Sequence, residues 1–584
     1  MTDILFINTA LKLELKQETN GTLLLATKLL EAGFQVQILR FAEISAKTSN
    51  YRNFIEEITG KILAMAPRCV SFYTLWPYYH IQLRIAAEVK KQNPAIITVM
   101  GGPQASATAE DTLQAMPFVD YVCAGEGENT VVPFFDAIFR QENPDLSQIP
   151  GLYYRENGKV TTGGLPIPRC DLDTLPYWDD RLLPVFDETP AQRQSKRYSM
   201  PIDVGRGCPF RCTFCCTSRF WNRMYRLKSP ERIVEEIQYY QEKFGIRHFM
   251  FSHDAFTVNN KLVEKVCDYI LEKKLDITWK CTSRIDCVSE ELLLKMKQAG
   301  MRQIEFGVET GSERMQKEVK KNLDLSKVRS IASFLLKNGI EVGLFFMYGF
   351  PEETEEDLNQ TLQLLFDVSD MGVQYLSMAY CRFNPTTPMT EQYFDQLVLD
   401  PEVKGLFRGM AGYEEELPMI RENKSIFPFY YHLHTPVRDE YHFAYQLMLV
   451  YHAYPKFARY LRQLYHGDNL KFYRDFVRCN RHILEQDMAH IMDKVNNHPL
   501  EMLHNILDSF DLPYISKIKE LLRFEDDTYR VYRSDEDISL RETYGFSYVD
   551  FKLKLPIEQY SNGKTEILLE RINGKKSLKL LNME

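Results

Sequence analysis

The sequence predicts an α/β protein: a doubly wound, Rossmann-like N-terminal domain, then a partial (β/α)6 barrel of the TIM type, then a mainly helical C-terminal region. Two blocks, residues 1–145 and 199–398, alternate short apolar runs with amphipathic stretches, which indicates parallel strands covered by helices. Residues 146–198 read as a linker between the blocks, and helical periodicity replaces the alternation over 399–584. A chain of 584 residues is long enough for several domains.

The first block contains five strand-like runs, at residues 3–8, 35–41, 69–75, 95–102 and 121–128. Five βα units fit a doubly wound domain, which binds its ligands at the carboxyl ends of the strands. Glycines gather at two of those ends, with Gly101 and Gly102 after the fourth run and Gly125 and Gly127 in the fifth. Glycine there lets the backbone approach a ligand closely.

The linker contains two short hairpin strands followed by Pro-rich, irregular chain. The second block has strand-like runs at 201–207, 247–253, 276–283, 302–308, 341–350 and 373–383. Helical stretches at 231–243, 261–273, 290–299, 325–338 and 355–371 separate them. Six βα units indicate a barrel or partial barrel, whose chemistry lies at the C-terminal ends of the strands.

The C-terminal region is rich in aromatic residues and holds nine of the 12 histidines. Its pattern is helical to about residue 525 and strand-like over the last stretch. We expect it to cap the barrel and to carry substrate specificity. The alternative is that this region is a helical core whose histidines are exposed and have no role in substrate binding.

The composition is that of a soluble globular protein, with 45% hydrophobic and 26% charged residues. A net charge of -9 and the lack of a Lys/Arg run argue against nucleic acid or an anionic membrane as partner. The first residues do not resemble a signal peptide, and no apolar run is long enough to span a bilayer. We therefore expect a cytoplasmic protein with reduced thiols.

The stretch "GCPFRCTFCC", residues 207–216, has cysteines in a C-x3-C-x2-C spacing at Cys208, Cys212 and Cys215. Three thiolates in one loop can hold three corners of a cubic iron–sulfur cluster and leave the fourth iron open to a small molecule. The alternative is structural zinc, with Cys216 or a distant residue as fourth ligand. The chain has no second C-x2-C pair, and adjacent cysteines point in different directions.

The cysteine loop at the first barrel strand, with the aromatic Phe214 before its third cysteine, resembles the radical S-adenosylmethionine (SAM) superfamily. The motifs after the next four strands agree: "SHDAFTVN" at 252–259, "SRID" at 283–286, "FGVETGS" at 306–312 and "YGFPEET" at 348–354. After the sixth strand, "FNPTTPM" resembles the family's Pro-Gly-Thr-Pro turn, with Thr386 in place of the glycine.

The resemblance implies that Cys208, Cys212 and Cys215 bind a [4Fe–4S] cluster. SAM would chelate the open iron, and an electron from the cluster would cleave SAM to a 5′-deoxyadenosyl radical. It further implies that some residues contact SAM: Phe214 near the adenine, Glu309 and Arg284 as polar contacts, and Asp254 at the amino group. A barrel salt bridge or a helix cap is the alternative role for these three polar residues.

The first domain resembles the cobalamin-binding domain that precedes the barrel in one radical SAM subclass, through "SFYT" at 71–74, "MGGP" at 100–103 and "AGEGE" at 124–128. The cobalamin contacts that this resemblance implies are Ser71, Thr74, Gly101, Gly102, Pro103, Gly125 and Glu126. The D-x-H-x-x-G motif, whose histidine binds cobalt, is absent. His80 is the domain's one histidine and reads as a surface or helix residue. A domain that no longer binds cobalamin is the alternative.

These resemblances imply a cobalamin-dependent radical SAM enzyme that methylates an unactivated carbon. Radical cyclisation or rearrangement without methyl transfer, and a non-catalytic cluster or cobalamin sensor, are the alternatives. The remaining cysteines are scattered, which disfavours a methylthiotransferase with a second cluster. We expect a small-molecule or peptide substrate and a low-potential electron donor of the flavodoxin or ferredoxin type. No residue is assigned as catalytic, because the cofactors carry the radical chemistry.

Overall fold

The computed structural model describes residues 2–8, 20–40, 50–164, 167, 169–182, 199–400, 412–486, 488–512, 515, 519, 558–561, 565–572 and 575–582. The chain divides into two compact units. The first contains residues 1–282, 298–300 and 382–433, and the second contains 283–297, 301–381 and 434–584. The first unit thus holds the predicted N-terminal domain together with the beginning of the predicted barrel.

A seven-stranded sheet forms the N-terminal domain, in the order β2-β1-β3-β4-β5-β6-β7. Its five parallel strands are β1 (Ile4–Asn8), β2 (Val36–Arg40), β3 (Cys69–Tyr73), β4 (Ile97–Gly101) and β5 (Tyr121–Cys123). All five were predicted from their apolar runs, and β1 is buried along its whole length. The strand order reverses beside β1, which is where doubly wound sheets open a ligand crevice.

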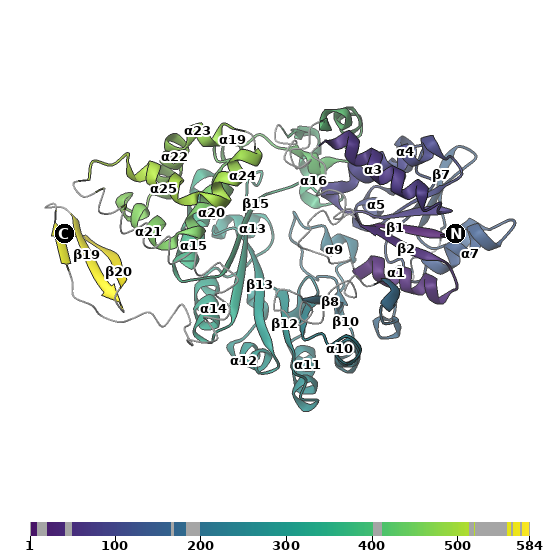
Figure 1. The fold of residues 1–584 in the computed structure, drawn as a ribbon, viewed down its shortest axis with the longest axis horizontal. Helices are drawn as coiled ribbons and strands as arrows, with labels where there is room; N and C mark the ends of the chain where they lie inside the picture. Colours follow the sequence, from purple (N-terminus) through teal and green to yellow (C-terminus); the bar gives the residue numbers. More distant parts are fainter. Residues whose placement is uncertain are drawn as a thin grey trace. The chain divides into compact units, whose positions relative to one another are not determined.

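Helices cover both faces of this sheet, as the doubly wound pattern requires. They are α1 (Asn20–Glu31), α3 (Tyr51–Ala64), α4 (Tyr79–Gln92), α5 (Pro103–Ala107), α6 (Ala109–Ala115) and α7 (Val131–Arg140). In Figure 1, α1 lies on the opposite side of the strands from α3 and α4. The loop at residues 9–19, which lacks the histidine of the cobalt-binding motif, lies outside the described residues.

The segment predicted as a linker packs against the domain over much of its length. Its hairpin strands β6 (Leu152–Glu156) and β7 (Lys159–Thr162) extend the sheet antiparallel beyond β5, so the sheet continues past residue 145. Leu172 and Leu175 are buried in a cluster with Leu24 of α1. The backbone N–H of Trp178 donates to the hydroxyl of Tyr240 at 2.8 Å. Apolar side chains in the Pro-rich stretch explain this docking; residues 183–198 are not described.

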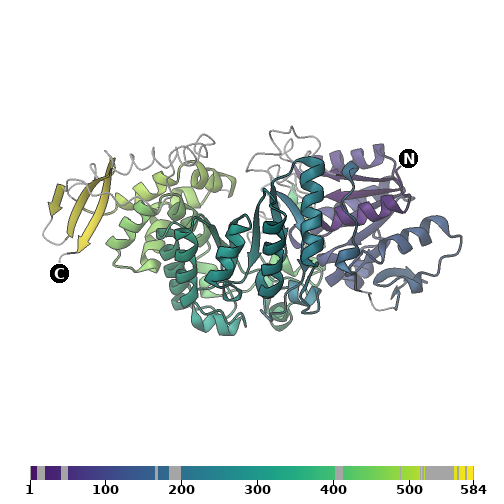
Figure 2. The same cartoon turned by 90° about the horizontal axis from the view of Figure 1, so that it is seen from below.

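The first unit also contains the first three βα units of the barrel. The strands β8 (Met200–Asp203), β11 (His248–Ser252) and β12 (Thr278–Ser283) are parallel, with β11 between the other two. A short ribbon, β9 (Gly205–Arg206) and β10 (Arg226–Leu227), flanks the cysteine loop and the short helix α9 (Thr217–Phe220). Helices α10 (Pro230–Phe244) and α11 (Asn260–Glu272) pack side by side (Figure 2).

Residues 382–433 complete the first unit with short elements. They are α16 (Pro388–Tyr393), β16 (Val398–Leu399), α18 (Leu417–Glu422) and β17 (Tyr431–His432).

The second unit contains the remaining barrel strands, β13 (Met301–Glu309), β14 (Glu341–Tyr348) and β15 (Tyr375–Tyr380), which are parallel in that order. Their helices are α12 (Glu290–Gln298), α13 (Glu313–Glu318), α14 (Ser326–Lys337) and α15 (Glu355–Asp370). A capping box at Thr354 and Asp357 begins α15. The six βα units predicted from the sequence are therefore all present in chain order.

The C-terminal region is helical, as predicted, with α19 (Pro436–Glu440), α20 (Ala444–Ala453), α21 (Pro455–Leu464), α22 (Asn469–Cys479), α23 (Arg481–Leu484), α24 (Met488–Asn497) and α25 (Pro499–Leu507). Phe366 of α15 stacks on Tyr451 of α20 with ring centroids 4.1 Å apart. The strand-like end forms an antiparallel sheet of β18 (Glu558–Ser561), β19 (Thr565–Ile572) and β20 (Lys575–Asn582). Within the described ranges, no helix has both the length and the apolar character needed to cross a bilayer.

Candidate functional site

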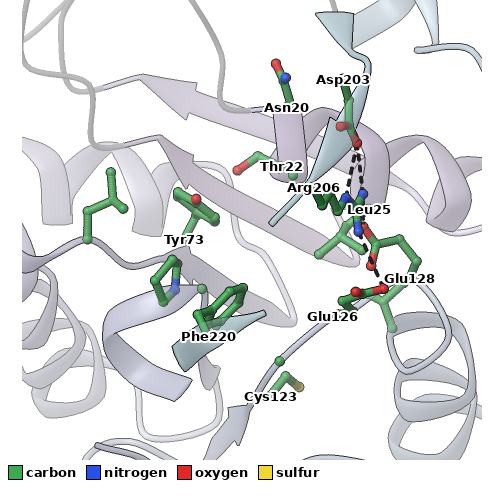
Figure 3. A pocket seen from close by; sticks show the side chains of 18 of the residues that line it. Asn20, Thr22, Leu25, Tyr73, Cys123, Glu126, Glu128, Asp203, Arg206 and Phe220 are labelled. Carbon is green, nitrogen blue, oxygen red and sulfur yellow. Dashed lines mark hydrogen bonds and ion pairs between the residues drawn. The ribbon is translucent and has the colours of Figure 1, made fainter. Parts of the chain in front are cut away.

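A cavity of about 570 Å³ lies in the first unit, at the carboxyl ends of β3, β4 and β5. Its lining includes six of the predicted cobalamin contacts, which are Ser71, Gly101, Gly102, Pro103, Gly125 and Glu126. Helix α1 contributes Asn20, Thr22 and Leu25 to the same cavity, and Tyr73 lies at the end of β3 (Figure 3). The structure thus brings together residues from three separate loops.

The loop after β4 owes its shape to Gly102, which has a φ of +92°. A Cβ at this position would lie 3.0 Å from both the N and the O of Thr74, so any side chain would be strained and crowded. Thr74 was predicted as a contact but does not line the cavity. It is fully buried, and its hydroxyl donates to Gly101 O at 2.8 Å and accepts from Ala105 N at 2.9 Å. Thr74 therefore joins the loops after β3 and β4.

The opposite wall of the cavity comes from the beginning of the barrel. It is formed by Pro201, Asp203, Gly205, Arg206, Cys216, Thr217, Phe220, Trp221, Met250, Ser252, His253 and Asp254. Cys216 directly follows the third cysteine of the predicted cluster motif. The cysteine loop and the glycine loops therefore border one cavity.

The three predicted cluster ligands lie in the loop between β9 and α9. Cys212 is buried, whereas Cys208 and Cys215 are half-buried. Burial is the largest of the effects that raise the pKa of the Cys208 thiol to about 11, and the neighbouring Cys215, Cys212 and Asp254 contribute to the increase. Cys212 and Cys215 thus lie near enough to Cys208 to affect its pKa, which is compatible with the predicted binding of one cluster.

A single zinc ion fits this loop less well. Tetrahedral zinc holds its sulfur ligands about 2.3 Å from the metal, so the sulfurs crowd together. Among the described residues, no group of three ligand atoms within 4.8 Å of one another includes these cysteines. Cys216 lines the cavity, whereas the three motif cysteines do not. Burial raises the pKa of Cys216 to about 12.

Asp254 lies between the cysteine loop and the cavity. Burial raises the pKa of its carboxyl group, which accepts a hydrogen bond from the Gly207 backbone and one from the Thr217 hydroxyl at 3.5 Å. It lines the cavity and also contributes to the shifted pKa of Cys208. This position is compatible with the predicted contact to SAM, which remains a prediction.

Five charged side chains form a buried group at the cavity wall, here called the charge cluster: Asp203, Arg206, Arg226, Glu126 and Glu128. Arg206 donates to Asp203 Oδ2 through Nε at 3.2 Å and Nη2 at 3.0 Å, and its Nη2 lies 2.6 Å from Glu128 Oε1 (Figure 3). Glu126 pairs with Arg226 and lies 3.7 Å from Arg206. The cluster connects the loop after β5 to the strands before the cysteine loop.

His253, after β11, is held as a neutral imidazole. Its Nδ1 accepts from Ala255 N at 2.9 Å, so Nε2 carries the proton and donates to Arg226 O at 3.3 Å. Burial lowers the pKa of His253 to about 4. His80 on α4, the one histidine of the N-terminal domain, is fully buried against Tyr430 and does not line the cavity.

The two other predicted SAM contacts, Arg284 and Glu309, lie in the second unit and are engaged in ion pairs. Arg284 binds Asp286 through two hydrogen bonds of 3.0 and 2.7 Å and donates to Lys321 O at 2.9 Å. Glu309 Oε1 accepts from Lys321 Nζ at 2.8 Å. Both residues thus meet at Lys321, which favours the salt-bridge alternative. Glu309 has a φ of +69°, a strained conformation typical of functional positions.

The turn after the sixth strand reaches the cysteine loop. Met389 N donates to Thr213 O at 3.1 Å, which fixes residues 383–389 beside the motif. Thr386, which replaces the family's glycine, has a φ of +62°, so the turn keeps a glycine-like conformation without a glycine. Phe214 is half-buried in the cysteine loop and does not line the cavity.

Sequence reasoning missed the charge cluster except for Glu126. Asp203 and Arg206 lie in the run predicted as the first barrel strand, and Glu128 lies within a quoted motif. A charged residue in an otherwise apolar strand was a usable signal, because such a residue needs a buried partner. The identity of the partners could not be read from one sequence.

Comparison with known proteins identifies both domains. A family model described as "B12 binding domain" matches residues 9–134, and one described as "Radical SAM superfamily" matches residues 202–365. The cofactors that these domains imply are cobalamin, SAM and a [4Fe–4S] cluster.

Curated relatives match part of the chain. An uncharacterized methyltransferase of Pyrococcus horikoshii is 31% identical over 52% of this chain and 63% of its own length. An anaerobic magnesium-protoporphyrin IX monomethyl ester cyclase of Rubrivivax gelatinosus is 26% identical over 53% of this chain and 56% of its own length. The match therefore spans less than two thirds of either relative.

Solved structures share the fold. The cobalamin-dependent SAM radical enzyme OxsB, with aqua-cobalamin and SAM bound, superposes with a TM-score of 0.56 at 14% identity, covering 94% of this chain and 84% of that one. The methyltransferase TsrM from Kitasatospora setae, with cobalamin and a [4Fe–4S] cluster bound, gives a TM-score of 0.55 at 16% identity, covering 69% and 81%. At such identities the likeness concerns the fold alone.

Proposed function

We propose that this chain, a radical SAM protein with an N-terminal B12-binding domain, is a cobalamin-dependent enzyme that methylates an unactivated carbon of a small molecule or peptide. The observation that carries the proposal is the shared cavity: Cys216, next to the cluster motif, faces the same space as Gly102 and Gly125. Two cofactors held by these loops would border one reaction space.

The candidate residues form two groups, one for the cluster and SAM and one for cobalamin. Cys208, Cys212 and Cys215 would hold the cluster, with Phe214, Asp254, Arg284 and Glu309 as candidate contacts to SAM. Ser71, Gly101, Gly102, Pro103, Gly125 and Glu126 would line the corrin site, with Thr74 positioning two of its loops. When bound, the cofactors supply a radical that removes a hydrogen atom and a methyl group that replaces it.

The chain's own contribution is to orient these groups and to exclude water. The hydrogen-bonded charge cluster and His253, which burial keeps neutral near neutral pH, belong to the wall of this cavity. A cytoplasmic location with a flavodoxin or ferredoxin as electron donor belongs to the same proposal, since the cluster needs reduced thiols and a low-potential electron.

The test is an anaerobic reconstitution with iron, sulfide, hydroxocobalamin, SAM and a low-potential reductant. We expect bound corrin, together with 5′-deoxyadenosine and S-adenosylhomocysteine as products. The triple variant Cys208→Ala/Cys212→Ala/Cys215→Ala should lose the cluster absorbance and the deoxyadenosine but keep the corrin. Cys479→Ala, on α22, is the matched control and should keep all three signals.

Other outcomes separate the alternatives. Corrin binding with deoxyadenosine as the one product, in the presence of a substrate that is turned over, would support cyclisation or rearrangement. Corrin and cluster without any SAM cleavage would support a sensor. Absence of corrin binding would overturn the cobalamin part of the proposal.

A further inference from the structure

Among the residues that the structure describes, one buried acceptor of the charge cluster lacks a hydrogen-bond partner. Glu126 uses Oε1 for Arg226, and its Oε2 accepts from Cys170 N at 3.2 Å. Asp203 Oδ2 accepts two hydrogen bonds from Arg206. The three carboxylates and two guanidinium groups of the cluster sum to one negative charge.

Glu128 differs from the other two carboxylates. Its Oε1 pairs with Arg206, whereas its Oε2 is buried and has no hydrogen-bond partner in the described part of the chain. Glu128 is 5% exposed and lines the cavity. A buried carboxylate oxygen that lacks a donor is costly, and such an oxygen in a cavity wall indicates a ligand that supplies one.

The backbone holds Glu128 in a fixed place. Gly125 has a φ of +79°, and its N–H donates to the Ser106 hydroxyl at 2.9 Å. A Cβ on Gly127 would lie 3.0 Å from Leu25 of α1, so the loop is closely packed on that helix. With Arg206 fixing its other oxygen, Glu128 is a preorganised acceptor.

We propose that Glu128 accepts, through Oε2, a hydrogen bond from a neutral N–H or O–H donor of the corrinoid held in this cavity. The inference rests on the proposed function and deepens it. It assigns the contact to Glu128 and gives Glu126, the residue expected from the sequence, the separate task of holding the cavity wall together. The negative charge of the cluster disfavours an anionic group such as a phosphate at this position.

A corrinoid offers two such donors: the carboxamide groups of the corrin ring, and the ribose hydroxyl of the nucleotide tail. Cobinamide keeps the carboxamides and lacks the nucleotide. Comparing the two corrinoids therefore distinguishes the two sources of the same hydrogen bond.

The experiment measures the dissociation constants of hydroxocobalamin and cobinamide by equilibrium dialysis, for the full-length protein and for Glu128→Gln. Glutamine keeps the volume and can still accept from Arg206, but it turns an NH2 group toward the donor. We expect binding about 10- to 100-fold weaker. Glu236→Gln is the matched control, because Glu236 is also a buried carboxylate paired with a cation, Lys228 at 2.6 Å, and does not line the cavity.

Each outcome decides the matter. Weaker binding of both corrinoids supports a contact to a corrin carboxamide, and weaker binding of cobalamin alone supports a contact to the tail. Unchanged constants for both overturn the inference, and leave the proposed function in place. Wild-type protein that binds neither corrinoid overturns the cobalamin part of the proposed function and this inference with it.

A structural role is tested separately by the thermal midpoint of the corrin-free proteins. A lower midpoint for Glu128→Gln with unchanged dissociation constants would mean that Glu128 serves Arg206 alone, against the inference. If Glu128→Gln fails to fold, Glu128→Asp replaces it. The shorter side chain keeps its charge for Arg206 but withdraws from the donor, so the same weakening is expected.

Discussion

Replacement of Arg206 by methionine tests the physical reasoning about the cavity wall most directly. Arg206 is 8% exposed and touches Asp203 and Glu128. Burial lowers the pKa of its guanidinium, but these two carboxylates raise it by more, so the net pKa lies above its ordinary value. Removing one partner of a buried ion pair destabilises a protein by about 3–5 kcal/mol, because the remaining charge is left in a medium of low polarity.

Differential scanning calorimetry of the whole chain is the assay. The entropy of unfolding is about 2.1 cal/mol/K per residue, so in a unit as large as the first 1 kcal/mol shifts the thermal midpoint by about 1.4 °C. Arg206→Met should therefore lower the midpoint of the first unit by about 4 °C or more. The two units can unfold separately. The transition that hydroxocobalamin shifts upward identifies the one to follow.

The control is Arg247→Met, which removes an exposed ion pair of the same unit. Arg247 Nη1 lies 2.8 Å from Asp276 Oδ2, and the side chains are 55% and 80% exposed. Such a pair contributes at most about 1 kcal/mol. Acid should protonate the carboxylates that lose Arg206, so the deficit of Arg206→Met should shrink as the pH falls. A deficit equal to that of the control, or one independent of pH, would refute the reasoning.

The other predictions use backbone strain and buried titratable groups. Gly102→Ala should destabilise the first unit by about 1 kcal/mol or more, because its φ is +92° and the new Cβ would meet Thr74; an unchanged thermal midpoint would contradict this. Thr386→Gly should keep or raise the midpoint, since a φ of +62° costs a residue with a Cβ roughly 1–2 kcal/mol; Thr386→Ala, which retains the strain, is the control and should show no gain. Burial lowers the pKa of His253 to about 4, so the stability that its neutral form contributes is full above its ordinary value of 6.5 and is lost as the pH falls toward 4. An NMR titration showing a charged His253 ring at pH 6 would exclude this. Burial raises the pKa of Glu353 to about 8, so its contribution is full below its ordinary value of 4.5 and is lost as the pH rises through 8; Glu353→Gln should flatten that part of a midpoint-against-pH curve, and an unchanged slope would count against it.

Most of the fold could be predicted because parallel strands covered on both faces leave apolar runs in the sequence. The ends of the strands were less predictable. The run at 121–128 was expected to be one strand, but β5 ends at Cys123, and the rest forms the glycine loop around Gly125. The hydrophobic pattern of the sequence does not show where a strand ends. In the structure the end is visible at Gly125, whose positive φ takes the chain out of the sheet. The packing of the predicted linker could not be read from the sequence for a related reason, since Leu172 and Trp178 are too few to show a period and yet are buried.

The site could be predicted only where its chemistry is local in sequence. The spacing of three cysteines within one loop, or of two adjacent glycines after a strand, is enough to indicate a binding role. Arg206 and Glu128 belong to different domains, and each is ordinary in its own segment. Their pairing arises from tertiary structure, which is also why Glu126 was chosen from the sequence and Glu128 was not.

Cys215 and Cys216 are adjacent in sequence, and they connect the predicted cluster site to the cavity. One lies in the cysteine loop and the other faces the cavity, and consecutive Cα atoms are about 3.8 Å apart. A change of backbone conformation at this point should therefore displace both the predicted cluster ligand Cys215 and the cavity-lining Cys216. An insertion between Cys215 and Cys216 should lower cluster content and corrin affinity together, whereas Gly102→Ala should lower corrin affinity and leave the iron content unchanged. If both measurements fell in parallel for Gly102→Ala, the two sites would be coupled by something other than this short connection.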